Sequence, residues 1–136
     1  MKDKYRILVV NQDEAVSEAI GEIQSMGEYT LELIHSATEA LEIVKRDKYH
    51  IVFIDLDIPG ENGIDLLKEM KAYDSLAQFI MTTNHSTMDK ILSSLEYGAY
   101  DYLVNPFINS KEVVLTINHT IEKLERWRKS ILDLVR

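Results

Sequence analysis

Residues 50–63 read HIVFIDLDIPGENG and contain the pattern that decides the fold. His50–Ile54 is a near-continuous apolar run of strand length, which is typical of a strand buried on both faces of a sheet. Asp55 follows at once, and a turn-rich stretch then leads through Gly63 into a segment with helical spacing of its apolar residues. A buried strand, a polar loop and an amphipathic helix make up one unit of a parallel α/β sheet.

The same unit recurs along the whole chain. Apolar runs of strand length occur at Tyr5–Val10, Thr30–His35, His50–Ile54, Gln78–Thr83 and Tyr100–Val104. Segments with helical spacing lie at Glu14–Met26, at Thr38–Arg46, after Gly63, at Met88–Tyr97 and from Ser110 toward Arg136. Five strands alternating with five helices predict an α/β fold with a doubly wound, five-stranded parallel sheet and right-handed crossovers. Thr30–His35 is expected at an edge because its apolar residues alternate.

Composition excludes several classes of protein. The chain has 136 residues, enough for one hydrophobic core, and a formal charge of −8, which argues against holding a nucleic-acid backbone. It has no cysteine, so disulfide scaffolds, cysteine zinc sites and thiol catalysis are excluded. No apolar run has the length of a membrane span, and the N-terminus lacks the pattern of a signal peptide. We expect a cytoplasmic domain that binds neither nucleic acid nor a membrane.

Ligand sites of such sheets lie at the carboxyl ends of the strands. Four segments should meet there, namely Asn11–Glu14, Asp55–Gly63, Thr83–Ser86 and Asn105–Phe107. Asp55 then has two readings: a carboxylate that caps the following turn, or a nucleophile that forms an acyl phosphate.

With these positions in place, the sequence resembles the receiver domains of two-component response regulators over residues 5 to about 122. The resemblance rests on four pieces whose order and spacing agree: Ile7–Val10 with Asp13-Glu14, Asp55-x-x-x-Pro59 with Gly63, Ile80–Thr83, and Gly98–Phe107. It implies the flavodoxin-like strand order 2-1-3-4-5, an order that the receiver fold itself exemplifies.

The resemblance also implies roles for particular residues. Asp55 matches the phospho-acceptor, which takes a phosphoryl group from a histidine of a partner kinase or phosphotransfer protein. Thr83 matches the hydroxyl residue that moves toward the phosphate, and Tyr102 the aromatic residue whose rotamer reports this movement. Pro106 matches a proline that follows a cis peptide bond in the family.

Three positions depart from the family pattern. Asn11 and Gln12 stand where two acidic residues usually hold Mg²⁺, and Asn105 stands where a lysine usually pairs with the phosphoryl oxygens. Mg²⁺ prefers anionic oxygen ligands, so we expect only a weak site. Its ligands would be Asp55 and Asp57, the latter through its carbonyl, with the Asp57 or Asp13 side chain as a partial substitute. Phosphorylation by small phosphodonors should accordingly be slow or absent.

Two functions therefore stay open, and neither makes the chain an enzyme in its own right. One is a switch that accepts phosphate on Asp55 and repacks a protein-interaction face. The other is a pseudo-receiver that serves for docking or dimerisation without phosphorylation. A third reading, a flavodoxin-like cofactor binder, lacks a phosphate-cradling loop, as no G-x-G-x-x-G or G-x-x-x-x-G-K-[ST] motif occurs.

The last segment from Ser110 contains no Gly or Pro and should form one helix of about 40 Å. We expect a receiver domain at residues 1–122 and a helical extension at 123–136. The extension either frays, or acts as a coiled-coil seam for a homodimer or a linker to an output domain. Its apolar positions follow a spacing of three and four residues, which is interrupted at Arg128. They are Val114, Ile117, Ile121, Leu124, Ile131 and Val135.

Overall fold

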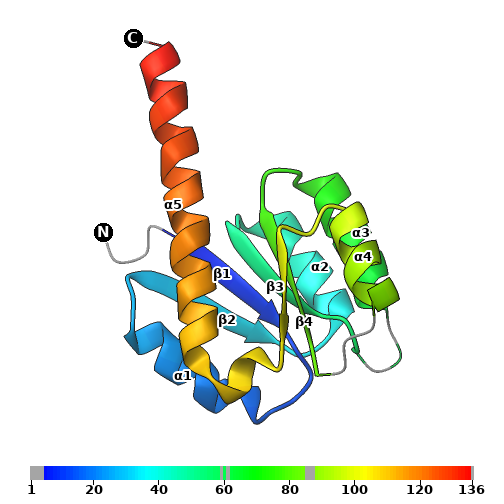
Figure 1. Cartoon of the computed structure of the whole chain (residues 1–136). Helices are drawn as coiled ribbons and strands as arrows, with labels where there is room; N and C mark the ends of the chain where they lie inside the picture. Colours follow the sequence, from blue (N-terminus) through cyan, green and yellow to red (C-terminus); the bar gives the residue numbers. More distant parts are fainter. Residues whose placement is uncertain (1–4, 59, 61, 85–87, 136) are drawn as a thin grey trace.

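The computed structural model describes residues 5–58, 60, 62–84 and 88–135. The strands are β1 (Tyr5–Val10), β2 (Tyr29–Ile34), β3 (Ile51–Asp55), β4 (Gln78–Thr83) and β5 (Asp101–Val104). The helices are α1 (Val16–Ser25), α2 (Ala37–Arg46), α3 (Gly63–Tyr73), α4 (Met88–Glu96) and α5 (Ser110–Leu134), with a 3₁₀ helix η1 at Pro106–Ile108. The strands pair in parallel in the order β2-β1-β3-β4-β5, which confirms the predicted sheet and the edge position of β2 (Figure 1).

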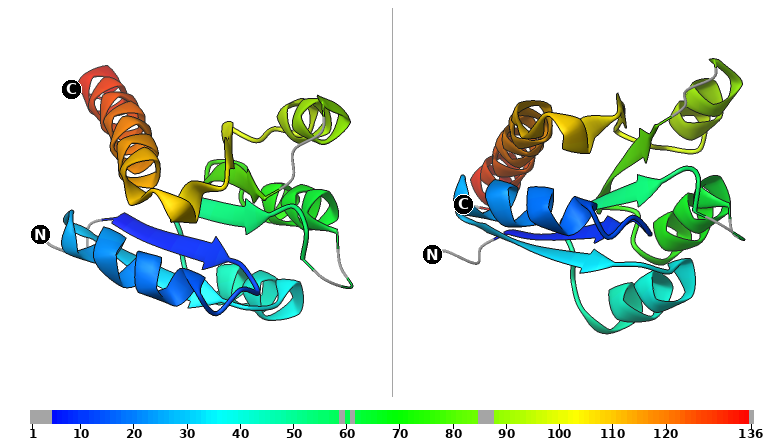
Figure 2. Two further views of the ribbon diagram at one scale, coloured as in Figure 1. Left: turned by 60° about the horizontal axis from the view of Figure 1, so that its bottom comes forward. Right: turned by 90° about the horizontal axis from the view of Figure 1, so that it is seen from below.

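Each face of the sheet has its own core because successive side chains of a strand point to opposite sides. Leu8 and Val10 of β1 pack with residues of α2 and α3, whereas Ile7 and Val9 pack with residues of α1 and α5. Figure 2 shows the corresponding layers, with α1 and α5 on one face of the sheet and α2 and α3 on the other. Burial on both faces explains why β1, β3 and β4 read as nearly continuous apolar runs.

Side-chain caps set where the helices begin. Asn62 starts α3, because its Oδ1 accepts a hydrogen bond of 2.9 Å from the Ile64 N–H. Asn109 starts α5 in the same way, through a bond of 3.1 Å from the Lys111 N–H. The Ser36 hydroxyl accepts from the Glu39 N–H at 3.2 Å and starts α2. Polar residues placed just before the helices thus fix the length of the loops at the carboxyl edge of the sheet.

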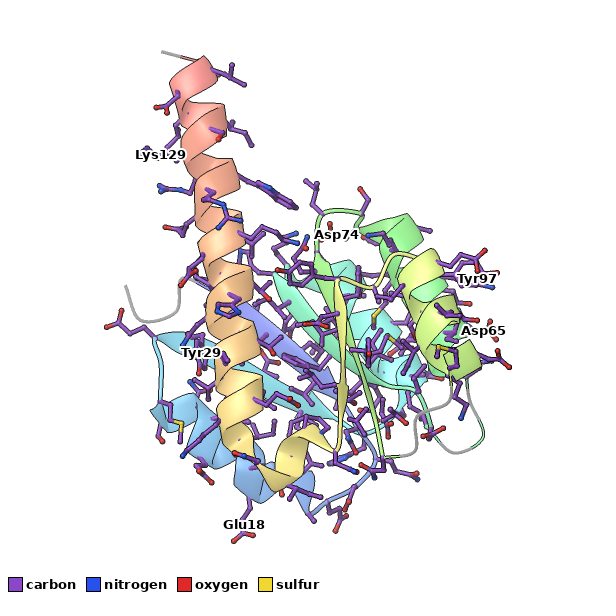
Figure 3. All side chains as sticks on the ribbon, in the orientation of Figure 1. Glu18, Tyr29, Asp65, Asp74, Tyr97 and Lys129 are labelled. Atoms are coloured by element: carbon purple, nitrogen blue, oxygen red, sulfur yellow. The ribbon has the colours of Figure 1, made fainter. Side chains whose placement is uncertain are left out.

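Helix α5 packs on the sheet with its first half and then extends past it. Val113, Ile117 and Thr120 are buried, and further along Glu125 and Lys123 still contact the body through hydrogen bonds with Tyr5 and Gln78. Beyond these residues the helix carries exposed apolar side chains, and Lys129 lies on this extending part (Figure 3). The helix is continuous through residue 122, so the boundary placed there stays a prediction. No helix of the described residues is both long and apolar enough to cross a membrane.

Two expectations need correction. The peptide bond before Pro106 is trans, not cis as the resemblance implied. Here the chain reverses at Asn105, which adopts a left-handed conformation with φ of 49° that asparagine tolerates better than most residues, and η1 follows. In α5 the most buried valine is Val113, with 1% of its surface exposed, whereas the expected core residue Val114 is only half-buried. The Asn109 cap sets where α5 begins, and the spacing of apolar residues in the sequence does not by itself show which of two adjacent valines points inward.

Candidate functional site

Asp55 is the last residue of β3 and lies half-buried at the carboxyl edge of the sheet. The Leu56 N–H donates to the Thr82 carbonyl at 2.8 Å, which continues the pairing of β3 with β4 past Asp55. The Asp57 N–H donates to Asp55 Oδ1 at 3.1 Å, while within the described residues no donor reaches Oδ2. One oxygen of Asp55 is thus held by the backbone and the other is available for chemistry.

The pKa of the Asp55 carboxyl is raised above its ordinary value, chiefly because burial disfavours the charged form. The backbone hydrogen bond from Asp57 and the positive charge of Lys90 act in the opposite direction, whereas the negative charges of Asp57 and Asp13 add to the increase. The effect of burial on the Asp55 carboxyl therefore outweighs the favourable contacts with the Asp57 backbone and with Lys90.

Thr83, Asp57 and Lys90 form a chain of polar contacts beside Asp55. The buried Thr83 hydroxyl donates to Asp57 Oδ2 at 3.0 Å, and Lys90 Nζ lies 2.8 Å from Asp57 Oδ1. These contacts join the end of β4, the loop after β3 and the first turns of α4. The Asp57 side chain is consequently directed toward Thr83 and α4.

The residues after β1 are engaged with the backbone. Asn11 is buried, and its Oδ1 accepts from the Asp13 N–H at 2.9 Å, while Asp13 Oδ1 accepts from the Ala15 N–H at 2.9 Å. His35 Nδ1 lies 2.9 Å from the carbonyl oxygen of Asn11. Gln12 is exposed. These bonds shape the loop and use one oxygen each of Asn11 and Asp13.

An open hollow of about 590 Å³ brings the predicted site residues together. Its lining includes no Lys or Arg from the part of the chain that the structure describes. The lining residues are Asn11, Gln12, Asp13, Glu14, His35, Asp55, Asp57 and Asn84. Asn105 lines a neighbouring hollow of about 500 Å³ that shares Asn11, Asp13 and Asn84 with the first. The amide that replaces the usual lysine thus lines a hollow that adjoins the one at Asp55, and the Asn105 N–H donates to the Thr83 carbonyl at 2.7 Å.

The donor set fits a tightly bound metal poorly. Among the described residues, no three His, Asp or Glu side chains are grouped as metal ligands would be. Asp57 directs its carboxylate to Thr83 and Lys90, and Asp13 uses one oxygen in a turn. Asp55 is thus the carboxylate best placed for a hard cation, and the amides at positions 11 and 12 add oxygens without the charge that Mg²⁺ prefers.

Tyr102 lies on β5 outside both hollows, opposite Met81 in the register of β4 and β5, and is partly buried against the core on the α3 side. Pro106 is buried at the start of η1. The sequence did not single out Lys90 as a site residue. The helical spacing of its segment indicates that Lys90 lies on the polar side of a helix, but not that this side faces Asp57. His35 and Asn84 also line the hollow, and their positions at strand ends were the available signal. Pro59 and His85 lie outside the described residues.

Comparisons with known proteins agree with this geometry. A family model for the response regulator receiver domain matches residues 7–118. Response regulator MprA of Mycobacterium ulcerans is 34% identical over 103 residues, which cover 75% of this chain and 44% of that protein. The chain thus spans about half the length of the curated relatives that it matches.

Solved structures show the same fold. A CheY-like response regulator receiver domain protein from Methanospirillum hungatei has a TM-score of 0.83 at 24% identity, covering 90% of this chain and 97% of that chain. The Mn²⁺-bound form of response regulator Rcp1 has a TM-score of 0.67 at 20% identity, with coverage of 74% and 80%.

Proposed function

This chain belongs to the response regulator receiver domain family, and on that premise we propose that it is a phosphorylation-dependent switch of two-component signalling. Asp55 accepts a phosphoryl group from a phosphohistidine of a partner kinase or phosphotransfer protein. A carboxylate oxygen of Asp55 bonds to phosphorus, the N–P bond breaks, and the histidine nitrogen leaves with the electron pair. The observation that carries this proposal is the placement of Asp55 at the carboxyl end of β3, with Oδ2 available and the Thr83 hydroxyl engaged by the neighbouring Asp57.

The chain's own residues would hold Asp55 for in-line attack. The Asp57 N–H orients Oδ1, and the open hollow gives a donor access to the other oxygen. Burial raises the pKa of Asp55, which accords with a carboxylate that is more basic than an exposed one. Mg²⁺ would bind weakly, through Asp55 and the Asp57 carbonyl with the amides of Asn11 and Gln12, and would supply charge neutralisation when bound.

An interaction face borders this site. Helix α4 exposes Met88, Leu92 and Leu95, and the following loop exposes Tyr97 and Tyr100. Phosphorylation would draw Thr83 away from Asp57, and the bond from Asn105 to the Thr83 carbonyl would carry the shift to β5, where Tyr102 lies. We expect this face of α4, β5 and α5 to bind partner proteins in a cytoplasmic setting, with no direct contact to nucleic acid.

The test is the intact mass of the protein after incubation with phosphoramidate or acetyl phosphate, with and without Mg²⁺. A gain of one phosphoryl group that is lost in Asp55→Asn supports the switch. Asp133→Asn is the matched control, because Asp133 is exposed near the end of α5, remote from the hollow. Slow labelling that rises only modestly with Mg²⁺ is the expected result for the wild type.

A second candidate function is the phosphorylation-independent pseudo-receiver. Neutral amides at positions 11, 12 and 105 favour it, together with a hollow whose described lining contains carboxylates and no cation. Under this reading Asp55 caps the loop and the exposed faces serve docking or dimerisation. The pseudo-receiver would be favoured over the switch if neither small phosphodonors nor phosphohistidine donors gave an Asp55-dependent gain in mass.

A further inference from the structure

Lys90 brings a positive charge to the edge of the acidic hollow from an unexpected element. It lies in α4, after β4, whereas the family's usual cation follows β5 at the position of Asn105. Its Nζ lies 2.8 Å from Asp57 Oδ1, and the other oxygen of this carboxylate accepts from the Thr83 hydroxyl at 3.0 Å. One carboxylate thus holds both the hydroxyl that should meet a phosphoryl group and a lysine beside it.

The site needs such a charge. The described lining of the hollow includes the carboxylates of Asp13, Glu14, Asp55 and Asp57 and no Lys or Arg. A phosphoryl group on Asp55 would add about two further negative charges. Without a cation, repulsion in a partly desolvated site would oppose the transfer.

Lys90 already acts on Asp55 electrostatically, since its positive charge lowers the pKa of Asp55 against the effect of burial. The Lys90 and Asp57 side chains are 44% and 38% exposed, and ion pairs of this exposure contribute little to folding. The long, flexible lysine stem can therefore exchange one anion for another at low cost.

We propose that Lys90 is the cation that pairs with the phosphoryl oxygens on Asp55, taking the role left vacant at Asn105. In the resting protein the Asp57 carboxylate occupies both Lys90 and Thr83. When Asp55 is phosphorylated, the more highly charged phosphoryl group takes over these two partners. This inference rests on the proposed phosphorylation of Asp55 and adds the residue that makes it feasible.

A consequence for signalling follows from the position of Lys90. Helix α4 is lightly anchored, because Ser94 is its buried residue within the described chain. Its outer side exposes Leu92 and Leu95. A change of partner by Lys90 would therefore act directly on the helix that carries the interaction face.

The absence of cysteine from the chain allows a direct test. In Lys90→Cys, a single thiol can be alkylated with 2-bromoethylamine to restore an amine of nearly lysine length, or with iodoacetamide to leave a neutral group. The rate of Asp55 phosphorylation by phosphoramidate is followed by intact mass. Lys129→Cys, on the extending part of α5, is treated identically as the control.

We expect Lys90→Cys to be phosphorylated about tenfold more slowly or worse, the loss expected for a charge-assisted contact. Aminoethylation should recover most of the rate, carbamidomethylation should not, and the Lys129 variant should match the wild type throughout. Equal rates for Lys90→Cys and wild type would overturn the role of Lys90 alone. A slow variant that aminoethylation fails to rescue would also overturn it, since the missing element would then not be charge. No Asp55-dependent gain in the wild type would overturn the proposed function, and the role of Lys90 with it.

Discussion

Gly63→Ala should damage the fold at the point where it supports Asp55. Gly63 is the first residue of α3, and a Cβ added there would lie 2.5 Å from the Asp55 carbonyl oxygen and 2.8 Å from Leu56 Cα. Both are backbone atoms, so neither can rotate away as the end of a flexible side chain would. The oxygen contact would be about 0.9 Å shorter than ordinary van der Waals contact.

Overpacking of this kind costs about 1–3 kcal/mol, and a clash with two backbone atoms belongs in the upper part of that range, at about 2–3 kcal/mol. With an unfolding entropy of about 2.1 cal/mol/K per residue, this loss corresponds to a melting temperature lower by about 7–10 °C. Phosphorylation of Asp55 should also slow, since relief of the clash displaces the end of β3.

Gly21→Ala is the matched control. Gly21 lies exposed in the middle of α1, and an added Cβ meets no atom within 4 Å. The same substitution there should raise the free energy of unfolding by about 0.5–1 kcal/mol through helix propensity. Urea titrations and thermal melts of both variants provide the measurement. If Gly63→Ala is as stable as the wild type, the argument that α3 packs too closely on β3 for a side chain is refuted.

Three further predictions concern charge and association. Burial raises the pKa of Asp55, so the ionised carboxylate destabilises the folded state at neutral pH. Asp55→Asn should therefore melt a few degrees higher than the wild type at pH 7, and the difference should disappear as the pH falls toward 3.8. An equal or lower melting temperature of the variant at pH 7 would contradict this. Burial disfavours the charge on Glu32, but hydrogen bonds from Arg6 at 2.7 Å and from the Tyr49 hydroxyl at 2.8 Å outweigh it and hold the pKa of Glu32 below its ordinary value. This stabilisation is present above pH 4.5 and is lost as the pH falls further, so Glu32→Gln should cost about 0.5–1 kcal/mol at pH 7 in urea titrations and little at pH 3; a loss independent of pH would point to packing instead. Residues 126–136 include the exposed Trp127, Ile131 and Leu132. Their removal should shift the mass measured by sedimentation from that of a homodimer toward that of a monomer and leave the melting temperature nearly unchanged. An unchanged mass with a lower melting temperature would show that the extension stabilises the domain itself.

Much of the fold was predictable because its signals are local. The apolar runs of β1, β3 and β4 reflect burial on both faces, each helix shows its own period, and α2, α3 and α5 begin at polar capping residues. Once the strands are known to be parallel, their carboxyl ends must share one edge, and the strand order implied by the family resemblance then places Asn11, Asp55 and Thr83 on neighbouring strands. The alternating apolar residues of β2 likewise indicated its edge position, which the pairing confirms.

The remaining features depend on directions that no local pattern contains. The helical period indicates that Lys90 is polar, but only the docking of α4 beside the loop after β3 places its amine on Asp57. The trans bond before Pro106 accompanies a left-handed turn at Asn105, and Asn105 lines the adjoining hollow rather than the hollow at Asp55.

The sequence by itself therefore determined the alternation of strands and helices and the edge of the sheet at which the polar residues gather, because hydrophobic periodicity is a local signal. The strand order was implied by the resemblance to the family and is not contained in any local pattern. Only the tertiary structure decided which of these charges face one another. Contacts between side chains from different elements depend on helix phase and loop conformation, and a shift of a few ångströms there separates an ion pair from two solvated charges.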